Sequence, residues 1–358
     1  MFTKNAVVSP TVTWCRKVLK SSKTFRAVLV NSGNANACTG PRGMEDCRET
    51  AVRLAKKLSI SSKEILIAST GVIGVPLPSG KILKAIPALA EKLSASGWGR
   101  SAEAILTTDL VAKSASLSYK TGKQKITIGG IAKGSGMIHP NMATMLAFIA
   151  TDAVIDKKTL HRALVEASEK TFNRITVDGE TSTNDMVLVL ANGQAGNRSI
   201  RPGSSAYRAF VGKLTTLCKD LAHRVVLDGE GATKFVTVRV QGAKAKTNAL
   251  AIANSVAKSP LVKTALFGED PNWGRIIAAV GYAGVPVNPD KIKIALNGSL
   301  LFKNGVPVRG ASQSALRKKM KSKNIVIVID LQAGRHSDEV YTCDLSYDYV
   351  RINAEYTT

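Results

Sequence analysis

The sequence is poor in the residues on which most metal centres and nucleic-acid surfaces depend. Its 358 residues include only four histidines and five cysteines, and no two cysteines form a CxxC pair. An odd number of scattered cysteines indicates reduced thiols in a cytoplasmic compartment and argues against a zinc site. Aromatic residues make up only 5% of the chain, so few side chains can stack on nucleic-acid bases. The sequence contains no GxxxxGK[ST] or GxGxxG motif and no internal repeat.

Acidic residues and long apolar runs are also scarce. Lys and Arg total 50 against 26 Asp and Glu, which gives a net charge of +24. Two explanations remain open: a basic surface on a protein whose ligands are acids, or a nucleic-acid-binding surface. The spread of the basic residues along the chain favours the first. No apolar run approaches the ~20 residues of a membrane helix, and the length predicts two domains or layers of a soluble protein.

Hydrophobic periodicity predicts a mixed α+β chain, with sheets flanked by helices. The strands are expected at 26–31, 64–69, 125–131, 186–191, 235–241, 291–296, 300–303, 325–331, 339–345 and 349–356. The helices are expected at 44–58, 79–96, 100–104, 157–171, 206–227 and 248–258. The first 44 residues carry seven basic residues and no acid, as a transit peptide would, but the strand within them argues against one.

The stretch from Lys133 to Asp152 combines features that place one side chain at a fixed point. Glycines at 134 and 136 permit a tight turn, and Pro140 stiffens the approach to an apolar run. Thr144 is expected to begin the buried strand that follows. It has two interpretations: an ordinary β-branched residue at a strand start, or a nucleophile activated by its own α-amino group after cleavage of the Ala143–Thr144 bond.

Three other polar turns have a structural and a functional interpretation. Thr70-Gly71 ends an apolar strand and is either an ordinary turn or a pair of oxyanion donors, a hydroxyl and an amide. Asp178 and Asp185 lie in a polar loop that suits turn hydrogen bonds better than a divalent metal. Glu230 lies in a Gly-Glu-Gly turn, where the carboxylate either points into a pocket or is solvated.

Taken together, these segments resemble the ornithine acetyltransferase family, also called bifunctional glutamate N-acetyltransferases. The matching segments span nearly the whole chain in family order: 31–37, 69–74, 133–146, 177–185, 270–275 and 348–358. The resemblance implies a self-processing enzyme of arginine biosynthesis. It would cut itself into residues 1–143 and 144–358, which stay intertwined in a heterotetramer with two copies of each fragment.

The resemblance also implies a mechanism. Thr144 would attack the acetyl group of N2-acetyl-L-ornithine, with its freed α-amino group as base, while Thr70 and Gly71 stabilise the oxyanion. Ornithine would leave, and L-glutamate would take the acetyl group from the acetyl-threonine to give N-acetyl-L-glutamate. The substrate-binding residues implied are Thr107, Lys133, Thr144, Glu230, Asn353 and Thr358. No metal or tightly bound cofactor is implied, and acetyl-CoA enters only as an alternative acetyl donor.

The sequence departs from the family pattern at a few positions. Residues 1–5 resemble an internal stretch of the family, so either the start is truncated or a first strand is missing. His139 replaces a small residue and Glu180 an Asp, and neither change removes a catalytic group. The alternatives to the transferase are a related self-processing amidase or aminopeptidase, a basic nucleic-acid-binding protein, and a decayed, inactive copy.

Overall fold

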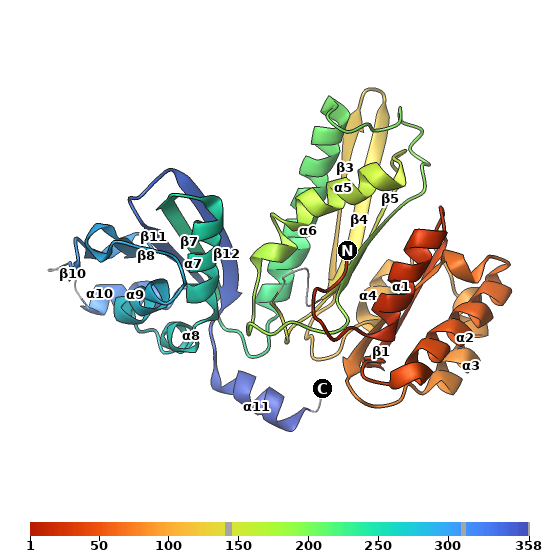
Figure 1. The fold of residues 1–358 in the computed structure, drawn as a ribbon, viewed down its shortest axis with the longest axis horizontal. Coiled ribbons are helices and arrows are strands. Elements are labelled where there is room, and N and C mark those ends of the chain that lie inside the picture. Colours follow the sequence, from red (N-terminus) through yellow and green to blue (C-terminus); the bar gives the residue numbers. More distant parts are fainter. Residues whose placement is uncertain (140–144, 309–312, 357–358) are drawn as a thin grey trace. The chain divides into compact units, whose positions relative to one another are not determined.

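The computed structural model describes residues 1–139, 145–308 and 313–356. Within this part, the chain forms two compact units (Figure 1). Unit 1 comprises Met1–Asn173 and Glu180–Val225, and unit 2 comprises Arg174–Gly179 and Val226–Tyr356. Each unit has helices and its own sheets, which confirms the α+β class. No helix of the described residues is long and apolar enough to cross a membrane.

Unit 1 is built around a sheet of order β3-β4-β5-β6. These strands are β3 (Lys113–Thr121), β4 (Gln124–Lys133), β5 (Leu146–Thr151) and β6 (Met186–Ala191). β4 is antiparallel to both neighbours, and β5 is parallel to β6. The helices α5 (Lys157–Ser168) and α6 (Ser205–Leu227) lie over this sheet (Figure 1).

The opposite face of this sheet packs against a second layer of unit 1. Side chains from β4, β5 and β6 share one apolar core with that layer. The layer contains the parallel strands β1 (Ala27–Asn34) and β2 (Ile65–Val72). Its helices are α1 (Pro10–Ser21), α2 (Gly40–Leu58), α3 (Ser79–Glu91) and α4 (Trp98–Ala104). Because both layers contribute to the core, the end of β2 and the end of β4 belong to one packed body.

The expected cleavage position lies between two paired strands. β4 precedes it and β5 follows it, and the two strands pair from Ile128↔Thr151 to Lys133↔Leu146. The beginning of the chain also bonds to residues beyond this position, since Thr3 donates from its hydroxyl to the Ser182 carbonyl at 2.8 Å. The two segments on either side of residues 140–144 therefore share one sheet.

Unit 2 contains a six-stranded sheet of order β10-β9-β8-β11-β7-β12. Its strands are β7 (Phe235–Ala243), β8 (Lys293–Leu296), β9 (Ser299–Lys303), β10 (Val306–Pro307), β11 (Asn324–Asp330) and β12 (His336–Cys343). β7 and β11 are parallel and the other pairs are antiparallel. The helices of unit 2 are α7 (Lys246–Lys258), α8 (Pro260–Phe267), α9 (Trp273–Gly281), α10 (Gln313–Met320) and α11 (Tyr347–Glu355). Short 3₁₀ helices span Ser62–Glu64 in unit 1, Pro289–Lys291 in unit 2, and Phe172–Arg174, where the chain passes from one unit to the other.

The expected strand at 349–356 is wrong, because these residues lie in helix α11. The aromatic and β-branched residues there favoured a strand. Ser346 decides otherwise: its hydroxyl accepts the amide hydrogen of Tyr349 and caps the helix. The expected helix at 79–96 is also too long, since α3 ends at Glu91. β3, β10, α1, α8, α9 and α10 had not been predicted as separate elements.

Candidate active site

Thr70 and Gly71 lie at the carboxyl end of β2, where it runs beside the end of β1. Gly71 has φ +125° and pairs with Gly33 of β1. A Cβ at position 71 would lie only 2.3 Å from the Gly33 carbonyl carbon and 2.5 Å from the Asn34 nitrogen. Only glycine fits this close approach of two backbones. The Gly71 amide is therefore held at a defined place beside the Thr70 hydroxyl.

Asn184 fixes this strand end from another part of unit 1. Its side-chain amide donates to the carbonyls of Ala35 at 2.5 Å and Ser69 at 2.9 Å. Ala35 follows β1 and Ser69 immediately precedes Thr70, so one buried amide joins both strand ends. Sequence reasoning had treated Asn184 only as part of a polar loop.

Lys133 brings together three of the residues expected in the site. It ends β4 and is 8% exposed. Its ammonium donates to the Thr107 hydroxyl at 2.7 Å and to the Thr70 hydroxyl at 3.2 Å. Thr107 comes from the loop after α4 and Thr70 from β2. Unit 1 thus gathers two hydroxyls around one ammonium group, an arrangement suited to binding and stabilising negative charge.

Asp109 completes this cluster. It was missed from the sequence, although the nearby Thr107 was expected to bind substrate. Its carboxylate lies 2.7 Å from Lys113 Nζ and 3.7 Å from Lys133 Nζ. Burial would raise the pKa of Asp109, but the two lysines and the hydrogen bonds outweigh burial and lower it. The spacing of Asp109 and Lys113 was visible in the sequence, but nothing there showed that both are buried.

Ala143, Thr144 and Thr358 lie outside the described residues. The described chain resumes at Met145, which is buried, and Leu146 is the pairing partner of Lys133. The chain therefore enters β5 directly beside Lys133, two residues after Thr144. The pairing of Lys133 with Leu146 is therefore the contact in the described residues that lies nearest in sequence to the expected nucleophile.

Glu230 and Asn353 are brought together in unit 2. Asn353 lies on α11, and its amide donates to Glu230 Oε2 at 2.8 Å. Glu230 is 7% exposed, so the carboxylate is held in the turn rather than solvated. Gly231 allows α11 to approach this turn, because a Cβ there would lie 2.5 Å from the Tyr349 nitrogen. Asn353 was expected in the site from the sequence, but on a strand.

The acids Asp178 and Asp185 do not belong to a recognisable metal site. Asp178 in unit 2 accepts a long hydrogen bond, 3.4 Å, from the Tyr349 hydroxyl. The carbonyl of Asp185 in unit 1 accepts the amide hydrogen of Thr3 at 2.9 Å. Among the residues that the structure describes, no group of three or more His, Cys, Asp or Glu side chains could hold a metal ion.

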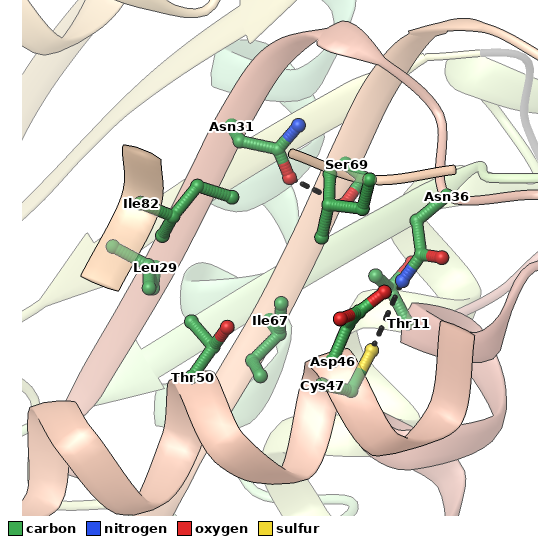
Figure 2. Close-up of a pocket in the computed structure, with 11 residues that line it drawn as sticks. Thr11, Leu29, Asn31, Asn36, Asp46, Cys47, Thr50, Ile67, Ser69 and Ile82 are labelled. Carbon is green, nitrogen blue, oxygen red and sulfur yellow. Dashed lines mark hydrogen bonds between the residues drawn. The ribbon is translucent and has the colours of Figure 1, made fainter. Parts of the chain in front are cut away.

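A small cavity lies beneath the end of β2, between the β1–β2 pair and helix α2 (Figure 2). Asp46 and Thr50 line it from α2, and Asn31 and Ser69 line it from the strands. The Ser69 hydroxyl donates to Asn31 Oδ1 at 2.6 Å. Asp46 Oδ2 and Thr50 Oγ1 are buried and have no hydrogen-bond partner in the described part of the chain. The cavity has room for about one water molecule.

A family model described as ArgJ family matches residues 1–358, the whole chain. The chain belongs to the ArgJ family. The arginine biosynthesis bifunctional protein ArgJ of Symbiobacterium thermophilum is 48% identical over 358 residues, which cover 100% of this chain and 89% of that protein. Its counterpart from Desulfotalea psychrophila is 50% identical over 331 residues, 92% of this chain and 84% of that protein.

A solved structure agrees with this assignment. The crystal structure of arginine biosynthesis bifunctional protein ArgJ from Bacillus halodurans is 44% identical, with a TM-score of 0.57. The matched region covers 60% of this protein and 100% of the Bacillus halodurans chain. The resemblance drawn from the sequence is thereby confirmed. The protein is a bifunctional acyltransferase of arginine biosynthesis, an ornithine acetyltransferase and glutamate N-acetyltransferase.

Proposed function

We propose that this enzyme of the ArgJ family makes its own nucleophile by cutting the Ala143–Thr144 bond, which leaves residues 1–143 and 144–358 intertwined. The paired strands β4 and β5 support this proposal, because they come from opposite sides of the cut and share one sheet. The fragments would stay together through that sheet after cleavage. Residues 144–358 make up 60% of the protein. The solved Bacillus halodurans chain, matched over its whole length, also covers 60% of this protein.

In the proposed reaction, Thr144 Oγ attacks the acetyl carbonyl of N2-acetyl-L-ornithine, and its α-amino group takes the hydroxyl proton. A free α-amino group has an unperturbed pKa of about 8, which suits a base near neutral pH. The Thr70 hydroxyl and the Gly71 amide donate to the oxyanion. The protonated α-amino group gives this proton to the ornithine nitrogen, and L-ornithine leaves. The amino group of L-glutamate then attacks the acetyl-threonine, its proton passes through the α-amino group to Thr144 Oγ, and N-acetyl-L-glutamate is released from the restored enzyme.

One observation carries most of this proposal: Lys133 bonds to the Thr70 and Thr107 hydroxyls at the point where β4 pairs with Leu146. The Lys133 ammonium and the Thr70 hydroxyl, the proposed oxyanion donor, therefore lie beside the strand β5, which begins two residues after Thr144. We assign Lys133 to a substrate carboxylate and Thr107 to the same pocket. Gly71, whose position only a glycine can occupy, supplies the second donor.

The remaining substrate contacts are assigned to Glu230, Asn353 and Thr358. Glu230 is suited to the ornithine ammonium, and Asn353 holds that carboxylate in place. Acetyl-CoA is the acetyl donor for the second activity, the acetylation of glutamate itself. We propose a heterotetramer of two copies of each fragment in the cytoplasm.

Two variants test the nucleophile. Thr144→Ala should stay uncut on a denaturing gel and lose acetyl transfer, because neither the hydroxyl nor the free α-amine beside it is available. Thr144→Ser should be cut and retain some activity. Thr121→Ala, a threonine at the end of β3, is the control and should behave as the wild type. An active, uncut Thr144→Ala enzyme would falsify the proposal.

A second measurement separates transfer from hydrolysis. After the first turnover, continued release of ornithine from N2-acetyl-L-ornithine should require glutamate and should yield N-acetyl-L-glutamate in equal amount. Release at the same rate without glutamate would identify an amidase, in which water takes the acetyl group from the same threonine.

A further inference from the structure

The Asp109 carboxylate lies close to Lys133 and connects three segments of unit 1. Its Oδ1 accepts hydrogen bonds from Lys113 Nζ at 2.7 Å and from the Gly134 amide at 2.6 Å. Its Oδ2 accepts the amide hydrogen of Thr107 at 3.2 Å and lies 3.7 Å from Lys133 Nζ. One carboxylate therefore connects the loop after α4, the start of β3 and the end of β4.

The charges of this cluster are almost completely removed from solvent. The side chains of Asp109 and Lys113 are fully buried, and that of Lys133 is 10% exposed. Burial opposes the ionised form of Asp109, but the two cations more than compensate and lower its pKa. Asp109 therefore stays ionised at neutral pH and attracts Lys133. This attraction is strengthened by burial, because water screens it poorly.

The position of Lys133 determines how Thr70 can donate. An ammonium group has donors only, so Thr70 Oγ1 must accept the hydrogen bond from Lys133. The proton of the Thr70 hydroxyl then points away from Lys133 and is available to another acceptor. A donor to a developing oxyanion must be oriented before the reaction to be effective.

We propose that Asp109, anchored by Lys113, is a positioning residue that holds Lys133 against Thr70 and thereby orients the Thr70 hydroxyl toward the oxyanion. Asp109 does not contact the reacting atoms and acts through Lys133. Lys113 acts one step further away, by holding Asp109 Oδ1. The inference rests on the proposed function, because it takes Thr70 as an oxyanion donor.

The first test is Asp109→Asn, which keeps the shape of the side chain and removes its charge. Misdirecting one oxyanion donor should lower kcat by about tenfold to a hundredfold, somewhat less than removing the donor. Asp152→Asn is the matched control, since Asp152 Oδ1 accepts the Thr127 amide hydrogen of the same strand β4 at 2.8 Å. The control should keep the wild-type kcat. Thermal unfolding and the gel assay for cleavage verify that both variants fold and mature.

A double-mutant cycle separates positioning from a purely structural role. If Asp109 acts through Thr70, Asp109→Asn should lower kcat by less than about threefold in a Thr70→Ala background, because the donor is already gone. Equal losses in both backgrounds would overturn the inference and leave the roles of Thr144 and Thr70 intact. A Thr70→Ala enzyme with wild-type kcat would contradict the oxyanion role in the proposed function, and this inference with it.

Discussion

Replacing Gly71 by alanine should move the Gly71 amide, the proposed oxyanion donor, and so test its role in the reaction. A Cβ at position 71 would overlap the backbone of Gly33 and Asn34 at 2.3–2.7 Å, and no flexible side chain is there to move aside. The residue also has φ +125°, which an L side chain rarely adopts. Backbone strain and overpacking of this kind together cost about 2–5 kcal/mol. The end of β2 must shift to relieve it, and the Gly71 amide shifts with it.

The expected result is a fall in kcat of about a hundredfold to a thousandfold, the range for loss of one oxyanion donor. The assay is steady-state formation of N-acetyl-L-glutamate from N2-acetyl-L-ornithine, together with urea unfolding of the same samples. Gly80→Ala is the control. Gly80 lies in α3, and a Cβ added there would meet nothing within 4 Å apart from its chain neighbours and the backbone of its own helix, so the change should be neutral or slightly stabilising. A Gly71→Ala enzyme with normal kcat would refute the role of this amide.

Three further predictions concern other parts of the chain. Asn353→Ala removes a hydrogen-bond donor to Glu230, so KM for N2-acetyl-L-ornithine should rise about tenfold while KM for glutamate stays the same. Equal rises for both substrates would contradict this prediction. Thr50→Val should lower the free energy of unfolding by about 1 kcal/mol if a water bridges Thr50 to Asp46 in the cavity; a more stable variant in urea would show that no water does. The lowered pKa of Asp109 means that its stabilising effect is complete above its unfolded value of about 4 and is lost as pH falls through the lower folded value. The free energy of unfolding of Asp109→Asn should therefore fall less steeply with decreasing pH in this range than that of the wild type. Identical pH dependence in the two proteins would argue against a lowered pKa of Asp109.

Local patterns were sufficient to place Thr70 and Gly71 of the candidate site at the end of a buried strand. The run Ile65–Ser69 is buried and leads directly into Thr70 and Gly71, as expected from the sequence. The strand expected at 125–131 is longer in the structure, and Lys133, expected in the glycine-rich turn, is the last residue of β4. Strand β3 was missed although Ala115, Leu117 and Tyr119 alternate along it, a signal that could have found it.

Long-range pairing was out of reach of such patterns. Asp109 joins the candidate site through Lys113 at the start of β3 and Lys133 at the end of β4, and no local spacing reveals that convergence. Asn184 is a similar case, since its partners lie about 115 and 149 residues away in the sequence. Helix α11 was mistaken for a strand because its aromatic and β-branched residues favour one. Its cap, Ser346, donates from its hydroxyl to the distant Gly231 carbonyl, a contact that no local pattern reveals.

The acetyl-enzyme itself offers the most direct test of the account. The enzyme is mixed with N2-acetyl-L-ornithine in the absence of glutamate, quenched in acid and digested, and the peptides are analysed by mass spectrometry. The account predicts a peptide that begins at Thr144 and carries one acetyl group on the threonine side chain. An intact Ala143–Thr144 bond in fully active enzyme, or an acetyl group on any other residue, would contradict it.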